Sequence, residues 1–315
     1  MYIVSHRALF FWITGIILAV AIGAILVFRL PLSIDFTGGS LIEVTYTAAR
    51  PDLPSLQQAV SALPLGETSV RENGANGVSV RARTLTPDEH QAVLAALSEN
   101  GTAALTEDQF TSIGPSLGNE LGKKAIWAIG AVILAIVLYI AWAFRKVSKP
   151  VSSWIYGVTV ILILVHDIII PTGFYAILAH FTGAQVDSLF VVALLAILGY
   201  SVNDTIVIFD RVREHLRVNI EKNVRQPFDE VVGQAIYETL GRSINTSLTV
   251  VLALIALAFL GSPVTFNFAL VLLVGVVAGT YSSILLAAPL LVPMARWFAK
   301  DAVIATAGNK KQNKR

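Results

Sequence analysis

The sequence GYSVNDTIVIFDR (199–211) places an Asn-Asp pair directly after the apolar run SLFVVALLAILGYSV (188–202). Asp204 therefore lies in a segment that is otherwise suited to lipid. A carboxylate near the bilayer centre costs about 2.5–3.5 kcal/mol on insertion scales. A polar contact between membrane helices averages only about 0.6 kcal/mol, which does not offset that cost. Because intramembrane carboxylates typically serve proton or ion paths, we interpret Asp204 as a functional group that binds a proton.

Other polar residues fall in or beside the apolar segments. Arg242 begins the fifth segment and is a candidate basic partner for Asp204, although an arginine at a helix end also commonly snorkels to the membrane surface. Asp167 follows His166 in the third segment and is a second candidate for proton transit. The polar motif around Asp204 consists of Ser201, Asn203 and Thr205. We expect no catalytic residues, no metal and no cofactor, with the proton as the coupling ion.

The composition indicates an integral membrane protein. Hydrophobic residues make up 55% of the 315 residues and charged residues 14%, whereas a soluble domain has about a quarter charged residues. The absence of cysteine excludes disulfides and thiolate metal sites. Six segments are long and apolar enough to cross a bilayer as helices, at about 20 residues per crossing. They lie near 9–28, 124–144, 152–175, 188–209, 243–261 and 269–293.

The distribution of positive charge predicts the orientation. Of the 23 Lys and Arg residues, 16 lie on one side of the six-helix arrangement, in Arg7 and in 145–149, 209–242 and 296–315. Short loops rich in Lys and Arg stay cytoplasmic, so we expect both termini inside and the long insert outside. The predicted divisions are 1–28 (N-terminus and first helix), 29–123 (outer domain), 124–293 (five helices, with an amphipathic cytoplasmic segment at 210–241) and 294–315 (basic tail).

Two features on or near the membrane have an apolar pattern. The stretch PFDEVVGQAIYETLG (227–241) places its apolar residues on one helical face, which we expect to lie along the inner membrane interface. That face comprises Phe228, Val231, Val232, Ala235, Ile236 and Leu240. On the sixth segment, Gly275 and Gly279 form a small-xxx-small motif that predicts close helix packing.

The outer insert has the element order β-α-β-β-α-β over residues 40–113, which is typical of the ferredoxin-like arrangement. Thr86 and Glu89 predict a capping box at the start of its second helix. The predicted fold is therefore a membrane all-α bundle of six helices with an α+β ferredoxin-like extracytoplasmic domain between helices one and two. Two glycine-bearing junctions flank that domain, as structured elbows or as hinges. Their residues are Asp35, Gly38, Gly39, Gly114 and Gly118.

Five stretches together resemble the SecF family of bacterial protein-export membrane subunits, which belongs to the resistance-nodulation-division superfamily. They are IDFTGGS after the first helix, SIGPSLGNELGKKA before the second, VHD in the third, GYSVNDTIVIFDRVRE in the fourth and LGRSINTSLT in the fifth. The motifs cover nearly the whole chain in order, and the tail beyond about Lys300 carries none.

The resemblance implies a protein of the bacterial inner membrane that forms half of a pseudo-symmetric twelve-helix unit with SecD. It further implies association with the SecYEG channel and commonly YajC, and use of the proton motive force to draw preproteins out on the periplasmic side. Asp204 looks like the family's intramembrane acid and Arg242 like its basic partner. Lipid is the surrounding medium, and no nucleic acid is expected.

Three alternatives remain open on the residues alone. A proton-coupled exporter of a lipid or small molecule from the same superfamily would need an apolar pocket in the outer insert. An intramembrane aspartyl protease would use Asp167 and Asp204, but Asp204 lies in GYSVND rather than in the GxGD setting of such proteases. A scaffold that only stabilises a channel would be indifferent to loss of the Asp204 charge.

Overall fold

The computed structural model describes residues 2–144, 153–224 and 226–297. Within them the chain forms two compact units. The helical unit contains the described parts of Met1–Arg29, Ala128–His180 and Leu189–Arg315, and the sheet-containing unit contains Leu30–Trp127 together with Phe181–Ser188. The basic stretch 145–149 and the tail beyond residue 297, both predicted to be cytoplasmic, lie outside the described residues.

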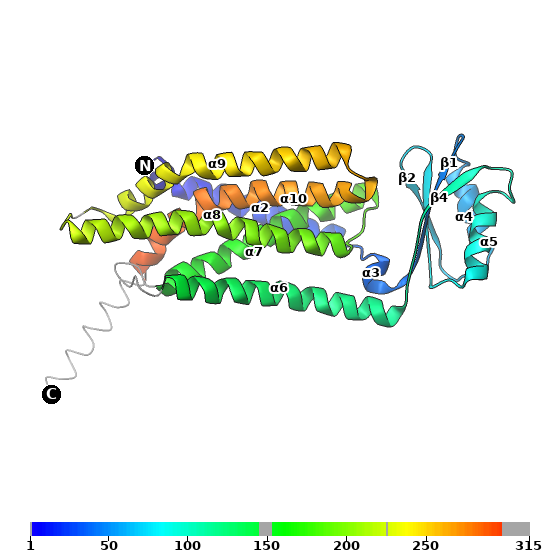
Figure 1. Ribbon diagram of the computed structural model, residues 1–315, viewed down its shortest axis with the longest axis horizontal. Coiled ribbons are helices and arrows are strands. Elements are labelled where there is room, and N and C mark those ends of the chain that lie inside the picture. Colours follow the sequence, from blue (N-terminus) through cyan, green and yellow to red (C-terminus); the bar gives the residue numbers. More distant parts are fainter. Residues whose placement is uncertain (1, 145–152, 225, 298–315) are drawn as a thin grey trace, which may run out of the picture. The chain divides into compact units, whose positions relative to one another are not determined.

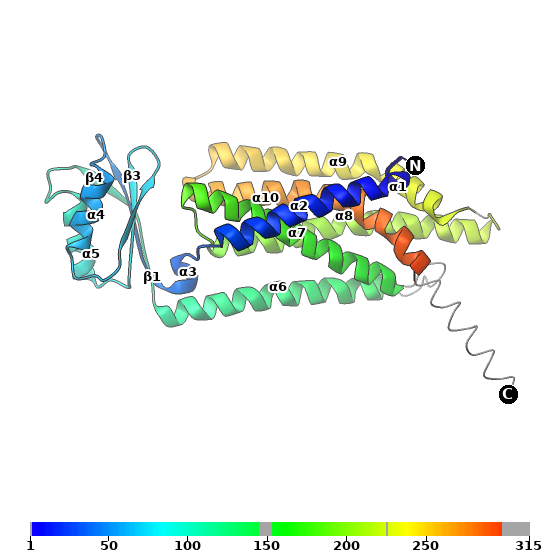
Figure 2. The same ribbon diagram turned by 180° about the vertical axis from the view of Figure 1, so that it is seen from behind.

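The helical unit is built from long helices that run side by side (Figure 1 and Figure 2). Six helices of the described chain are long and apolar enough to cross a membrane, which confirms the predicted number of spans. They are α2 (Arg7–Phe28), α6 (Pro115–Ala143), α7 (Ser153–Thr182), α8 (Ser188–Glu221), α9 (Phe228–Leu260) and α10 (Pro263–Ser282), the last continuing through the π-helical turn η1 (Ser283–Ala287) as far as Trp297. The short helix α1 (Tyr2–Ser5) precedes them.

The centre of the helical unit is formed by α7, α8 and α10. Buried residues make up 56%, 50% and 56% of the most apolar stretch in these three helices, against 17% in α2 and α9 and 6% in α6. The outer helices expose large apolar side chains such as Leu134, Leu138 and Phe259. Exposed apolar faces of this kind suit lipid or another apolar helix. The polar side chains that are buried among the three central helices, such as Asp167 and Asp204, are therefore shielded from water.

Helix α9 differs from the sequence-based prediction. It is one continuous helix, so Arg242 lies near its middle rather than at its end. The apolar face that precedes Arg242 is covered by protein, because Val231, Val232 and Ala235 are fully buried in the core of the helical unit. Its place along the inner membrane interface stays a prediction. Amphipathicity shows that one face of a helix is apolar. It does not show whether lipid or protein covers that face.

The sheet-containing unit packs two helices on one face of a four-stranded antiparallel sheet (Figure 1). The strand order is β2-β3-β1-β4. Alternation along the strands turns Ile42, Val44 and Val80 towards the helices, where they are fully buried with Leu56 and Leu97. The elements are α3 (Ile34–Thr37), β1 (Gly39–Tyr46), α4 (Leu53–Ser61), β2 (Ser69–Asn73), β3 (Gly77–Ala82), α5 (Pro87–Leu97) and β4 (Leu105–Ile113).

Helix α5 begins with the capping box that the sequence predicted. The Thr86 hydroxyl accepts a hydrogen bond from the Glu89 amide at 3.3 Å, and the Glu89 carboxylate accepts one from the Thr86 amide at 2.8 Å. Arg83 also donates to this carboxylate. The hydrogen bond from Arg83, followed by that from Thr86, lowers the pKa of Glu89 to about 2.

We predict that Glu89→Gln weakens α5 at neutral pH and removes part of its acid sensitivity. The pKa of Glu89 in the folded chain lies below the ordinary value of 4.5, so its carboxylate stabilises the fold above that value, and the contribution is lost as the pH falls through about 2. The measurement is hydrogen exchange of the α5 amides, corrected for intrinsic rates, in the parental protein and in Glu89→Gln, from about pH 6 down to about pH 2. Equal acid sensitivity would contradict the assignment.

Candidate functional site

Asp167 of α7 is fully buried in a chain of hydrogen bonds. Its carboxylate accepts a hydrogen bond from the Ser201 hydroxyl on α8 and lies 2.8 Å from Nδ1 of His166. Nε2 of His166 lies 2.6 Å from the hydroxyl of Tyr281 on α10, and Tyr281 interacts in turn with the Thr14 hydroxyl on α2. Imidazole and carboxyl groups both accept and release protons, so this series of hydrogen-bonded side chains can hold a proton and pass it on.

Asp204 of α8 is also buried, but it is only partly satisfied. Its side chain is 4% exposed, and Oδ2 has no hydrogen-bond partner among the described residues. The Ser243 hydroxyl of α9 is likewise buried and has no hydrogen bond of ordinary geometry among the described residues. It lies close enough to Asp204 to interact with its carboxyl group. Most buried polar groups in proteins are hydrogen-bonded. Two neighbouring buried groups without a hydrogen-bond partner among the described residues set this place apart from the Asp167 cluster.

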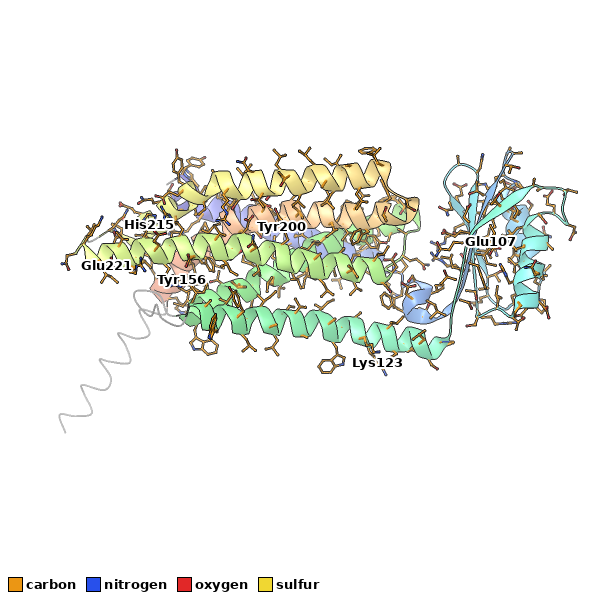
Figure 3. The ribbon with its side chains drawn as sticks, viewed as in Figure 1. Glu107, Lys123, Tyr156, Tyr200, His215 and Glu221 are labelled. Atoms are coloured by element: carbon orange, nitrogen blue, oxygen red, sulfur yellow. The ribbon has the colours of Figure 1, made fainter. Side chains whose placement is uncertain are left out.

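The predicted basic partner Arg242 is not brought into this cluster. It is exposed on α9, and no ion pair joins it to Asp204 in the described part of the chain, although its charge still acts on Asp204 through space. The ionic contact between α8 and α9 is made by Glu238, which lies 2.5 Å from Nε of Arg211 and 2.9 Å from Nε2 of His215. His215 lies towards the C-terminal end of α8 (Figure 3).

The predicted polar motif of α8 is divided between its two faces. The hydroxyls of Thr205 and Ser283 lie 2.8 Å apart, and both donate to the Ser201 carbonyl, at 3.2 Å and 3.3 Å. Ser283 begins the π-helical turn η1, and π turns inside α-helices are frequent at functional sites. Asn203 is exposed. Ser201 and Thr205 therefore join the buried cluster, whereas Asn203 does not.

Several hydroxyls of the cluster were not recognised from the sequence. Tyr281 and Ser283 on α10 are two of them. A third is Ser247 of α9, which lies 2.9 Å from the hydroxyl of Tyr200 and 2.6 Å from that of Thr280; Tyr200 lies midway along α8 (Figure 3). Hydroxyls in apolar helices commonly bond a carbonyl of their own helix. For the α10 hydroxyls the only local signal was their position in the small-residue stretch GVVAGTYSS (275–283), and Ser247 lies outside that stretch.

Gly275 and Gly279 bring α10 close to α8, as their spacing predicted. A Cβ on Gly275 would lie 2.1 Å from Cδ1 of Ile197, and a Cβ on Gly279 would lie 3.0 Å from Cβ of Ser201. Small residues at these positions let two helix backbones approach. This approach accompanies the contacts of the α10 hydroxyls with the Asp167 cluster, in which Tyr281 meets His166 and Ser283 meets the Ser201 carbonyl.

The junction glycines lie in the sheet-containing unit, where the two motifs meet. A Cβ on Gly38, whose φ is +76°, would lie 2.6 Å from Cα of Pro115, and a Cβ on Gly118 would lie 2.6 Å from the Gly38 nitrogen. Gly39 has a φ of +125° and lies against a carbonyl of β3, whereas Gly114 faces open space. The start of α6 is therefore packed against the α3 turn, which favours a structured elbow over a free hinge.

Asp35 belongs to the same junction and not to the cluster of buried acids. Its Oδ2 accepts a hydrogen bond from the Ser188 amide at 2.8 Å. Ser188 is the first residue of α8, the helix that carries Asp204. The structure therefore links this junction residue to the start of the helix with the predicted proton site.

Six apolar helices with acids buried among them, and a sheet-containing unit inserted between the first two, define a multi-pass membrane protein with an intramembrane polar site. Residues 93–297 match the family described as "Protein export membrane protein SecD/SecF, C-terminal", and residues 23–49, which include Gly38 and Gly39, match the SecD/SecF GG motif. The chain belongs to the SecD/SecF family of protein-export membrane proteins.

Full-length relatives are of the SecF type. The protein translocase subunit SecF of Anaerolinea thermophila is 36% identical over 97% of this chain and 99% of its own length. That of Thermobaculum terrenum is 36% identical over 95% of this chain and 94% of its own length.

The fold is similar to that of solved SecDF structures. The crystal structure of SecDF, a translocon-associated membrane protein from Thermus thermophilus, matches with a TM-score of 0.80 at 30% identity, over 94% of this chain and 39% of that chain. SecDF in its super-membrane-facing form matches with a TM-score of 0.64, also at 30% identity, over 95% of this chain and 39% of that chain. The chain thus spans 39% of the length of the SecDF chains.

We predict that Gly275→Leu displaces α10 from α8, because the new side chain would begin inside the van der Waals radius of Ile197. Overpacking of this kind costs about 1–3 kcal/mol, so the thermal midpoint of the detergent-solubilised protein should fall. Gly130→Leu on α6 is the matched control, since a Cβ there meets nothing within 4 Å. Similar losses in both variants would contradict the assigned contact.

Proposed function

We propose that this chain serves as the SecF subunit in protein export across the bacterial inner membrane and that it couples export to the proton motive force through Asp204. The full-length SecF relatives support the first part. The second part is carried by one observation, the buried Oδ2 of Asp204 that lacks a hydrogen-bond partner among the described residues.

Protonation of Asp204 changes what its surroundings must provide. With a proton bound, the side chain is neutral and needs no ion pair, as in the arrangement described above. After the proton leaves, the carboxylate is a buried charge, and an unpaired buried charge costs about 3–5 kcal/mol. That cost draws the Arg242 guanidinium of α9 towards α8. Each 100 mV of membrane potential supplies about 2.3 kcal/mol per charge moved, a comparable amount.

Asp167 is the second acid of the proposed proton path. Its carboxylate is held by Ser201 on one oxygen and by His166 on the other. Ser201 lies one turn before Asp204 on α8, so the two acids share a helix as well as a core. His166 and Tyr281 extend the path towards α2 and α10. In this proposal Asp204 responds to the gradient and Asp167 receives or returns its proton.

The proposed partners follow from the relatives. SecD supplies the second six-helix half, and the exposed apolar faces of α6 and α9 are available to that half or to lipid. The assembly acts with the SecYEG channel, commonly with YajC, on a translocating preprotein. Both termini lie in the cytoplasm and residues 29–123 in the periplasm. The element order β1-α4-β2-β3-α5-β4 and the antiparallel strand order β2-β3-β1-β4 support a ferredoxin-like periplasmic domain.

We predict that Asp204→Asn abolishes the stimulation of export by a proton gradient while the complex still assembles. Asparagine keeps the size of the side chain and mimics its neutral form, but it cannot exchange a proton. The measurement is export into reconstituted vesicles with and without an imposed gradient. Asp210→Asn is the matched control, because Asp210 is an exposed acid on the same helix. Gradient-stimulated export by Asp204→Asn at the parental rate would end the proposal.

We predict that Asp167→Asn lowers gradient-stimulated export by roughly a hundredfold or more, the range for loss of an acid or base group. The amide can still accept the Ser201 hydrogen bond, so loss of activity would report on the proton rather than on packing. Thermal stability and co-purification with partners should stay close to parental values. A variant that is unstable and inactive to the same degree would instead assign Asp167 a structural role.

A further inference from the structure

A second carboxylate of the chain is placed where it can transmit a movement of α8. Asp35, half-buried in the first turn of α3, accepts a hydrogen bond from the Ser188 amide at 2.8 Å. The first amides of a helix have no partner within the helix, and a side-chain oxygen that accepts one of them stabilises the helix start. A negative charge there is also favoured by the helix dipole. Asp35 thus caps α8 from a segment 153 residues earlier in the chain.

The backbones on either side of this cap are paired as well. The Val186 amide donates to the Pro31 carbonyl at 2.8 Å, and the Ser33 amide donates to the Val186 carbonyl at 2.8 Å. Leu32 and Val186 form a parallel β-bridge, and Val186 is buried. We call this set the clasp; it consists of Pro31, Leu32, Ser33, Asp35, Val186 and Ser188.

The clasp is fixed at both of its ends to the rest of the sheet-containing unit. Ser33 accepts the Asp35 amide at 3.1 Å and so holds the turn that orients the carboxylate. The Gly38 backbone that follows is packed against the start of α6. On the other segment, Arg71 of β2 donates to the Gly183 carbonyl at 3.0 Å. Neither segment of the clasp is therefore a free loop.

We propose that Asp35 is a positioning residue that couples α8 to the sheet-containing unit. The inference rests on the proposed function, because it concerns how a change of protonation at Asp204 is transmitted through α8 to the sheet-containing unit. Asp204 lies sixteen residues after Ser188 on one continuous helix, about 24 Å along its axis at 1.5 Å per residue. A shift of α8 is carried along the helix to its capped start, and the clasp passes it to α3, β1 and the sheet.

The closing experiment uses the full chain with its partners in reconstituted vesicles. Asp35→Ala removes the cap, and Asp35→Asn keeps an oxygen that accepts the Ser188 amide. Ser188→Pro removes the donor from the other side, and proline is well tolerated at the first position of a helix. Because the chain contains no cysteine, Leu32→Cys with Val186→Cys gives a single disulfide across the bridge, a spacing that disulfides can span.

We expect Asp35→Ala and Ser188→Pro to lower gradient-stimulated export several-fold and Asp35→Asn to retain most of it. Hydrogen exchange at the Ser188 amide, which loses its acceptor, should rise about fivefold to tenfold in Asp35→Ala, the effect of a lost cap. Oxidising the cysteine pair in the Asp35→Ala background should restore export, and a reductant should abolish the restored part. This rescue separates coupling from a local contribution to stability.

Two results would overturn the inference: parental export by Asp35→Ala, or a fully formed disulfide that restores nothing. The outcome is distinguishable from failure of the proposed function. If Asp204→Asn exports at the parental rate while the disulfide still rescues Asp35→Ala, the proton proposal fails and the coupling by Asp35 stands. If Asp204→Asn is inactive and the disulfide rescues nothing, the proton proposal stands and the coupling fails.

Discussion

The burial of acids inside an apolar helix core is the constraint from which the rest of the helical unit follows. Asp167 is accommodated because hydroxyl and imidazole groups bond both of its oxygens. Asp204 has fewer hydrogen-bond partners, because its buried Oδ2 has none among the described residues. A group in that condition is sensitive to its own protonation, because a neutral acid tolerates such a place and an ion does not. The two buried acids thus differ in their hydrogen bonding: both oxygens of Asp167 are bonded, whereas one oxygen of Asp204 is not bonded among the described residues.

Glycine residues allow close packing between backbones in both units. In the helical unit, Gly275 and Gly279 let α10 approach α8, and the hydroxyls of Tyr281 and Ser283 reach His166 and the Ser201 carbonyl. In the sheet-containing unit, Gly38 and Gly118 lock the start of α6 against the α3 turn. In both places a side chain would separate elements that must touch. The glycines therefore act through the space they leave more than through flexibility.

Much of the architecture could be predicted from local sequence, because hydropathy and capping are local properties. The six spans and the Thr86–Glu89 capping box are examples. The contacts that define the site could not, since they join residues far apart in the chain. Arg242 was expected to begin a helix that in fact begins at Phe228, and Tyr281 gave no sign of its contact with His166. The sequence of the loop Phe181–Ser188 likewise contains no motif that would predict its inclusion in the sheet-containing unit.

The π-helical turn η1 sets the angular register of everything that follows it in the chain. A π turn accommodates one residue more than an α turn. Removing one residue there would rotate the last stretch of that helix by about 100° relative to α8. Leu291 and Val292, now fully enclosed, would then point away from the core while the glycine contact upstream stayed intact. A one-residue length difference at this point would therefore change the buried face of the final helix without changing its composition.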